Sequence, residues 1–221
     1  MTVNLEKKLR DAAREGNIEI VTHLLGNPQL YIQDTDEEGN DALIWASRRG
    51  NVDIVRKLIE HGIPLNRQNE QGNSALHLAL ALKHEQVAMT LVQSGADVHL
   101  KNENESTALL LASSHGYINT ALELLKKGAD VHQRNMFGNT ALSIASKNGH
   151  SKVVKKLLEF GADIEMMNNE GKLAKDYALL GGHSTVVALL DEVSSHTRSI
   201  YDVCPPYSSY SSSTVISTQL Q

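Results

Sequence analysis

The sequence contains few of the residues that build several common kinds of protein. Its 221 residues include a single cysteine, Cys204, which excludes an intrachain disulfide and a cysteine-rich zinc site and is typical of a reducing compartment. Aromatic residues make up only 4%, fewer than the core of a β-sandwich or barrel usually contains. No apolar run approaches the roughly 20 residues of a membrane-spanning helix, and the polar start Met1-Thr2-Val3-Asn4 predicts no signal peptide.

Positive charge is also scarce. The chain has 21 Lys and Arg against 26 Asp and Glu, which gives a formal net charge of −5. Because contact with nucleic-acid phosphates needs clustered cations, this balance argues against broad nucleic-acid binding. The densest basic segments, around Lys126 and Lys155, are accompanied by Glu123 and Glu159. We therefore expect a solvated helical face there rather than a contact with nucleic acid or lipid.

The chain does contain an internal repeat. A pattern of Gly-Asn-Xaa-Ala-Leu, varied to Glu-Ser-Thr-Ala-Leu in the third copy, recurs every 33 residues from Gly39, Gly72, Glu105 and Gly138, and the next step reaches Gly171. A second glycine follows 23 residues into each unit, at Gly62, Gly95, Gly128 and Gly161. A fixed period of this length is typical of a solenoid, in which similar units stack side by side.

Each unit predicts two short helices and a turn. Small polar residues precede the first helix and can cap its free backbone N–H groups: Asp41, Ser74, Thr107 and Thr140. An alanine-rich stretch follows, which lets neighbouring helices approach closely. A second helix, such as 153–158, shows an apolar stripe at helical spacing and ends at the second glycine. The remaining segment, such as 129–137, is expected to project as a hairpin.

These motifs resemble the ankyrin repeat. The segments Gly138-Asn139-Thr140-Ala141-Leu142, Gly149-His150, Val153-Val154 and Gly161-Ala162-Asp163 match that family's pattern in register, over roughly residues 5–193. Two departures occur in the repeated units: alanine stands where the family has proline after the cap, and Asn69, Asn102, Asn135 and Asn168 replace an aspartate. Because asparagine still forms the Asx turn, the resemblance implies an all-α solenoid of helix-turn-helix pairs with projecting β-hairpin loops.

The resemblance and the repeat boundaries together predict seven segments. The two end units deviate as caps, with a highly charged first helix and with Lys175 in a position usually held by leucine. The expected division is a capping repeat at 5–38, internal repeats at 39–71, 72–104, 105–137 and 138–170, a capping repeat at 171–193, and a serine-rich, disordered tail at 194–221.

Residues that carry chemistry are present, but not in a catalytic pattern. His84, His150 and His183 share one slot of the repeat, and His99 and His132 lie one unit apart, so a shared zinc ion is not expected. Cys204 lies in a Ser/Pro/Tyr-rich stretch with no base in reach, and no phosphate-binding glycine loop or H-E-x-x-H motif occurs. We expect no enzymatic activity, no cofactor and no metal. Trp45, in the slot of Leu78, Leu111, Ile144 and Tyr177, is interpreted as core packing.

The ankyrin resemblance implies a groove, formed by hairpin tips and first helices, that binds another protein. The expected partner-binding residues are Glu37, Glu38, Arg48, Arg49, Gln71, Asn73, Leu82, Asn104, His115, Met136, Phe137, Lys147, Asn148, Asn169 and Lys172. Met136-Phe137 at a hairpin tip, beside Met166-Met167, is a candidate apolar anchor, with Phe137 folded back on its own hairpin as the alternative. The acidic segment 34–38 is predicted either to steer a basic partner or to be simply solvated.

The predicted function is a non-enzymatic protein-binding module, monomeric and cytoplasmic, with no nucleic-acid or membrane partner. Its groove is expected to centre on the third to fifth units. Two alternatives stay open: an effector secreted by an intracellular bacterium into a host cytosol, and a regulator, cytoplasmic or nuclear, controlled by phosphorylation of its tail, for example at Tyr201. The hairpin residues Asn66, His99 and His132 lie in sequences similar to those modified by an asparaginyl hydroxylase; plain hairpin hydrogen bonding is the other interpretation.

Overall fold

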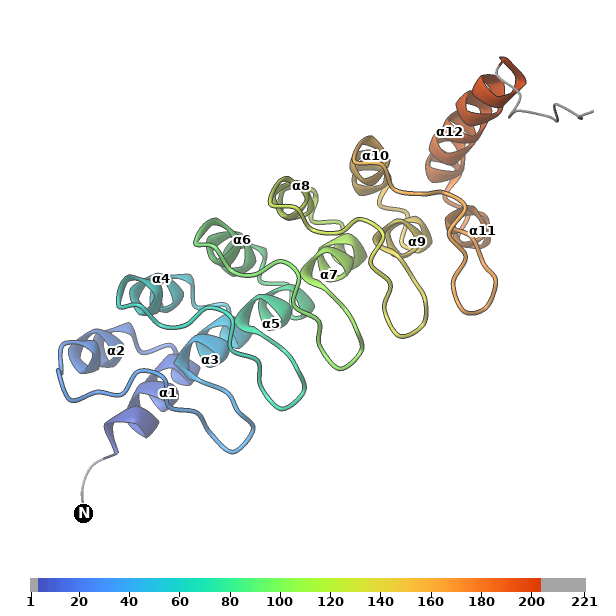
Figure 1. Cartoon of the computed structure of the whole chain (residues 1–221). Helices are drawn as coiled ribbons and strands as arrows, with labels where there is room; N and C mark the ends of the chain where they lie inside the picture. The colour runs from blue at the N-terminus through green and yellow to red at the C-terminus, as the bar shows by residue number, and fades with distance from the viewer. Residues whose placement is uncertain (1–3, 204–221) are drawn as a thin grey trace, which may run out of the picture.

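A computed structural model describes the backbone of residues 4–203 and the side chains of residues 4–195. Over this range the chain forms paired helices that stack into an elongated solenoid, with one layer of first helices, one layer of second helices, and loops that project beyond the first helices (Figure 1). The helices are α1 Leu5–Glu15, α2 Ile18–Leu25, α3 Ala42–Arg49, α4 Val52–Glu60, α5 Ala75–Ala81, α6 Glu85–Gln93, α7 Ala108–His115, α8 Ile118–Lys126, α9 Ala141–Lys147, α10 Ser151–Glu159, α11 Ala174–Leu180 and α12 Ser184–Val203.

The predicted caps begin most of the first helices. The Asp41 carboxylate accepts from the backbone N–H of Ile44 at 2.8 Å, and the Thr140 hydroxyl accepts from Ser143 at 3.2 Å. Ser74 forms a capping box with His77. Thr107 is the exception among the four, since its side chain makes no capping bond.

The repeated apolar residues form one continuous core along the stack. The leucine that follows the first alanine of each internal unit is at most 1% exposed, at Leu43, Leu76, Leu109 and Leu142. The alanine three residues later is fully buried in each unit, which allows first helices of adjacent units to pack directly. The core is therefore a chain of interfaces between neighbouring units rather than a single central core, as solenoid stability requires.

The projecting loops follow a hairpin path, but their two arms do not form strands. The only bridge in residues 4–203 is an isolated antiparallel one between Gln68 and Ser74. Instead, each loop tip bonds to the next along the stack: the backbone N–H of Glu70 donates to Glu38 O at 3.0 Å, and that of Met136 donates to Asn104 O at 3.0 Å. The all-α fold class is thus confirmed, and the loops are turns tied to one another (Figure 1).

The asparagines that replace the family's aspartate have a structural reason. Asn69 Oδ1 accepts from the backbone N–H of Gln71 and Asn73, so the Asx turn is kept. Its Nδ2 donates to Asn40 Oδ1 in the preceding loop at 2.9 Å, a bond that a carboxylate cannot donate. The same inter-loop bond joins Asn102 to Asn73 and Asn168 to Asn139.

The histidines that share the slot after the inter-helix turn have a structural role between adjacent units. His84 Nε2 lies 3.2 Å from Arg48 O of the preceding unit, and its ring fills the space beside Gly50, where an added Cβ would lie 2.5 Å from His84 Nδ1. His150 and His183 repeat this contact with Ser114 O and Lys147 O.

One unit departs from this glycine–histidine pairing at both positions. Where the later residue is Tyr117 instead of histidine, the turn residue is Lys83, which holds a φ of 68° normally reserved for glycine. A side chain is thus present at the turn where the facing residue is Tyr117, whereas Gly16 is kept where the facing residue is Asn51.

The C-terminal boundary differs from the prediction. We expected the last repeat to end at residue 193 and disorder to begin at Ser194, but α12 continues to Val203. No glycine or proline occurs between Ser184 and Cys204 to stop the helix, and the hydroxyls of Ser194 and Ser195 donate to Leu190 O and Glu192 O within it. The predicted disorder of residues 204–221 lies outside the described residues.

Candidate protein-binding surface

The groove is the surface between the loops and the first helices along the stack; at its N-terminal end Trp45 of α3 meets the loop residue Asp36, and in its C-terminal half it deepens into a cavity. A cavity of about 310 Å³ lies there between loop residues, including Ser106 and Asn139, and residues of α7, α9 and α11, including Leu111, Ile144 and Tyr177. Lys147 and Asn148 of the predicted site line it as well. The cavity therefore lies in the fourth and fifth of the predicted units, with Tyr177 from the cap and no residue from the third unit, so a groove centre that includes the third unit stays a prediction.

The slot that we assigned to core packing faces this groove instead. Leu78 is buried, but Trp45, Leu111, Ile144 and Tyr177 are only half-buried. The interpretation of Trp45 as a core residue is therefore wrong. The sequence pattern is compatible with a core-facing position for Trp45. In the structure, the neighbouring unit covers Leu43, two residues earlier, and leaves Trp45 partly at the surface.

The aromatic residues of this slot stand at the two ends of the groove, and each is flanked by two cations. The guanidinium carbons of Arg14 and Arg48 lie 5.0 and 5.3 Å from the centre of the Trp45 ring. At the other end, Lys147 and Lys172 lie 5.5 and 5.7 Å from the Tyr177 ring. These distances are those of cation–π contacts.

The apolar loop tip predicted from the sequence is exposed. Met136 is 49% and Phe137 59% accessible, and Met167 on the next loop is 54% accessible. The alternative, in which Phe137 folds back on its own hairpin, does not agree with this exposure. The tip is held in place from both sides, because Phe137 N donates to Asn135 Oδ1 and Asn169 Nδ2 donates to Met136 O, each at 3.0 Å.

The predicted partner-binding residues all lie at the surface, and several also join adjacent units. Asn73, His115 and Lys172 are half-buried, and the other twelve are exposed. Asn148 Nδ2 donates to Ser114 O of the preceding unit at 2.9 Å. Asn169 contacts Met136 and Arg134 in the same way. Their role in binding stays a prediction, alongside this structural one.

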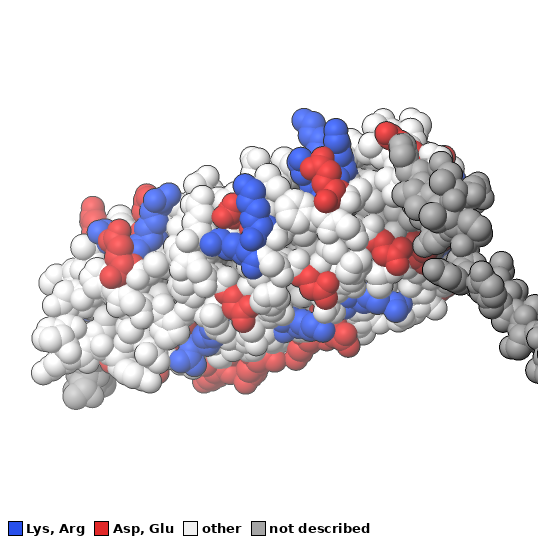
Figure 2. Space-filling view, turned by 45° about the horizontal axis from the view of Figure 1, so that its top comes forward, with Lys and Arg blue, Asp and Glu red and all other residues white. Residues whose placement is uncertain are grey.

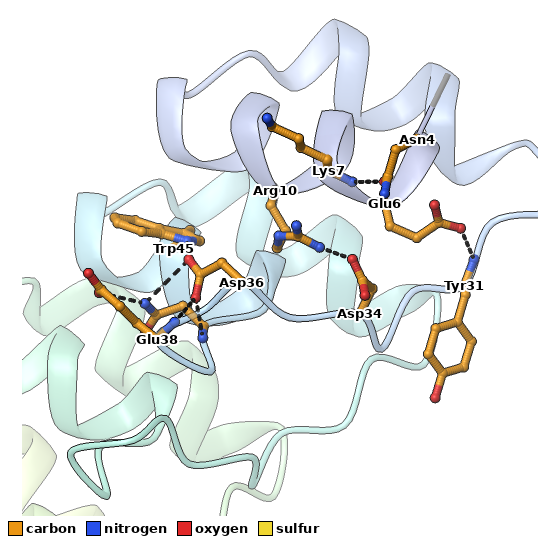
Figure 3. Close-up of polar contacts among 10 residues, drawn as sticks. Asn4, Glu6, Lys7, Arg10, Tyr31, Asp34, Asp36, Glu38 and Trp45 are labelled. Carbon is orange, nitrogen blue, oxygen red and sulfur yellow. Dashed lines mark hydrogen bonds and ion pairs between the residues drawn. The ribbon is translucent and has the colours of Figure 1, made fainter. Parts of the chain in front are cut away.

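The acidic segment 34–38 is not a free acidic patch (Figure 3). Asp34 forms an ion pair with Arg10, and Asp36 Oδ2 accepts from Trp45 Nε1 at 2.7 Å. Glu38 Oε2 accepts from Asn40 Nδ2 at 3.1 Å. Burial raises the pKa of Asp36, but the hydrogen bonds from Asn40, Trp45 and Glu38 outweigh it and hold the pKa below its ordinary value. Three of the four carboxylates in this segment therefore already have partners.

Other candidate chemistry is used within the fold. Ser74 Oγ lies 2.8 Å from His77 Nδ1, a pair that suggests a nucleophile and base, but both residues are buried and His77 Nε2 contacts Ser106 O. Burial lowers the pKa of His77, which favours the neutral ring, although bonds to Ser106 and Leu100 oppose the shift. Within residues 4–195, no three His, Cys, Asp or Glu side chains are grouped to hold a metal ion.

The surface charges are mixed. On the face drawn in Figure 2, blue and red side chains lie together in clusters that uncharged surface separates. Lys156 of the basic segment pairs with Glu159 at 2.5 Å. None of the helices described here has both the length and the apolar character to cross a bilayer.

The three residues predicted as hydroxylation sites, Asn66, His99 and His132, are exposed on their loops. Asn66 Oδ1 accepts a hydrogen bond from Asp97 N at 2.8 Å. The hydroxylation of these residues stays a prediction.

The comparisons with known proteins agree with this architecture. A family model described as ankyrin repeats (3 copies) matches residues 9–102 and 109–198, so the chain belongs to the ankyrin-repeat family. The chain is also similar to one in the solved structure of the Bd0816 predatory endopeptidase from Bdellovibrio bacteriovorus in complex with immunity protein Bd3460. That similarity has 28% sequence identity and a TM-score of 0.75, and covers 84% of this chain and 97% of that one.

Proposed function

We propose that this chain is a non-enzymatic module that binds a protein partner through the groove between its loops and first helices. The ankyrin repeats indicate a protein-interaction module. The observation that carries the finer proposal is the exposed apolar cluster on two adjacent loop tips, Met136, Phe137 and Met167, beside the groove. Exposed aromatic and methionine side chains held on a rigid scaffold are typical anchors of protein interfaces.

The size of the groove suits an ordinary interface. A stable complex buries about 800 Å² on each partner, so we expect the partner to contact the tips and first helices of several units, the third to fifth by our prediction. Because the loops are joined by backbone and asparagine bonds, the surface is rigid before the partner arrives. A rigid surface loses little conformational entropy on binding.

The test uses the two phenylalanines of the chain as a matched pair. Phe137 is 59% exposed on a loop tip, and Phe160 is 41% exposed at the end of α10, in the layer of second helices. Tagged wild type, Phe137→Ala and Phe160→Ala are used to capture partners from cell extract, with quantitative mass spectrometry. We expect Phe137→Ala to lose the specific partner and Phe160→Ala to keep it. An unchanged set with Phe137→Ala would contradict the proposed centre of the groove.

A second candidate follows from the comparison structure, which contains an endopeptidase and an immunity protein. By analogy, the partner of this chain would be a peptidase that the groove occludes. Adding purified chain to the captured partner and following cleavage of a casein substrate tests this directly. The effector and tail-phosphorylation alternatives depend on the tail, most of which lies outside the described residues, so a reporter-export assay and phosphoproteomics of Tyr201 remain their tests.

A further inference from the structure

Two arginines at the N-terminal end of the groove have no acidic partner among the side chains that the structure describes, residues 4–195. Arg14 of α1 and Arg48 of α3 occupy equivalent positions in adjacent units, and both guanidinium groups contact the Trp45 ring, at 5.0 and 5.3 Å. The ring is itself fixed, because its Nε1 donates to Asp36. The tryptophan therefore holds two cations side by side on the groove surface while their N–H groups stay available.

The nearby carboxylates do not neutralise these cations. Asp34 pairs with Arg10, and Asp41 lies 3.6 Å from Arg67. Asp11 and Glu15 line a hollow with Arg14 and Arg49, yet within residues 4–195 no carboxylate comes within ion-pair distance of Arg14, Arg48 or Arg49. In the acidic segment 34–38, Asp36 bonds to Trp45 Nε1 and Asn40 and forms no ion pair with either arginine (Figure 3). This end of the groove thus has unpaired positive charge, which does not favour a basic partner, one of the two predictions for that segment.

The opposite end of the groove is different. Lys172, one of the two cations on Tyr177, pairs with Glu170 at 3.0 Å. Lysine also offers a single charged group rather than the planar fork with which arginine holds a carboxylate. The two ends are therefore not equivalent: among residues 4–195 Lys147 is the one unpaired cation at Tyr177, whereas Trp45 carries two unpaired arginines side by side.

On the proposed function that the groove binds a protein, we infer that this N-terminal end binds an acidic segment of the partner. A glutamate or aspartate side chain would accept hydrogen bonds from Arg14 and Arg48, with its aliphatic part against Trp45. A protein carboxylate is favoured over nucleic acid because the unpaired cations at this end are few. A phosphate backbone needs an extended basic track.

Trp45 is the one tryptophan of the chain, so its intrinsic fluorescence reports on binding at this site. Full-length protein is titrated with a short peptide of alternating glutamate and alanine, with glutamine and lysine versions in parallel, while tryptophan fluorescence is followed. We expect saturable change with the glutamate peptide only, weakening as salt rises. Arg14→Gln/Arg48→Gln should weaken this binding by about tenfold or more, since charge-assisted bonds are lost.

The matched control removes the same charge elsewhere. Arg56→Gln/Lys152→Gln changes two exposed cations on α4 and α10 and should leave the affinity within about twofold, because exposed charges far from the site are screened. Binding to the double variant is followed with a labelled peptide, and thermal melting checks that both variants fold. Equal affinity of the glutamate and glutamine peptides, or undiminished binding to Arg14→Gln/Arg48→Gln, would overturn the inference. So would tighter binding of a single-stranded oligonucleotide than of the glutamate peptide.

The cellular partner separates this inference from the proposed function. Loss of the partner from both Phe137→Ala and Arg14→Gln/Arg48→Gln supports both. Loss from Phe137→Ala alone overturns the acidic site and leaves the groove in place. Loss from the arginine variant alone supports the acidic site and contradicts the choice of Phe137 as an anchor.

Discussion

Within each unit, the interior slots and the groove slots follow different rules. The interior leucine is identical in four internal units and at most 1% exposed. Two residues along the same helix, the groove slot changes from Trp45 through Leu78, Leu111 and Ile144 to Tyr177. The loops show the same contrast, between the asparagine of the Asx turn and a tip residue that is Glu37 in one loop and Met136 in another. The positions that repeat from unit to unit pack between units. The positions that vary from unit to unit lie on the surface that a partner can contact.

The largest expected effect lies in the interior. Leu109→Ala removes a fully buried side chain between two units and should cost roughly 2–5 kcal/mol of unfolding free energy through lost transfer energy and a cavity. Leu180→Ala, at a side chain 74% exposed, should change stability by less than about 0.5 kcal/mol. Urea denaturation measures both. Similar losses would break the distinction between interior and surface slots.

The glycine–histidine contact should come next. Gly50 and Gly62 have φ of 74° and 79°, so alanine at either should cost about 1–2 kcal/mol from the left-handed backbone alone. Gly50→Ala also drives a Cβ against His84, whereas Gly62 has nothing within 4 Å. We expect a larger fall in melting temperature for Gly50→Ala. His84→Ala in the same chain should recover part of the difference, and equal losses at both glycines would refute the contact.

A pH effect should separate a buried histidine from an exposed one. Because burial holds the pKa of His77 below its ordinary 6.5, the folded state binds fewer protons than the unfolded state. Its stability contribution is complete above pH 6.5 and is lost as pH falls below that value toward the folded pKa. His77→Gln should flatten this part of the curve in urea midpoints measured across pH 6.5. A slope that His77→Gln leaves unchanged would contradict this assignment, and His132→Gln is the matched control for replacing a histidine by glutamine.

The smallest effect is expected in the loop ladder. Asn69→Asp keeps the Asx turn but loses the donor to Asn40, at a cost of about 1 kcal/mol. Asn135 faces a unit with Ser106 in place of asparagine, and only its oxygen takes part in the hydrogen bonds described. Asn135→Asp should therefore change stability by a few tenths of a kcal/mol at most. Thermal melting at equal pH compares the two, and equal losses would argue against the ladder.

The sequence was sufficient for whatever depends on periodicity. The capping residues, the buried leucines and the histidine slot all follow from a 33-residue spacing, because each unit meets the same neighbours. It did not reveal which side of a first helix faces the groove, so Trp45 was placed in the core. Nor did it reveal that Asp34 would pair with Arg10 and Asp36 with Trp45, because the first contact lies in the deviating capping unit and the second joins two units.

The helix end was missed for a related reason. Serine-rich composition predicted disorder from Ser194, but nothing in 184–204 breaks a helix, and α12 simply continues. A useful signal was present at the groove ends: aromatic residues occupy one slot in the first internal unit and in the C-terminal cap, each with a cation in the preceding unit. Arg48 was among the predicted residues, and looking for variation within the repeat would have added Arg14 and Tyr177.

The central claim is that the groove between the loops and the first helices is the binding surface. Hydrogen exchange of the chain, alone and with the partner captured by wild type but not by Phe137→Ala, tests it most directly. The account predicts slower exchange in the loops at 103–106 and 134–140 and in α7 and α9, with little change in α4, α6, α8 and α10. Slower exchange confined to those second helices, with the loops unaffected, would contradict it.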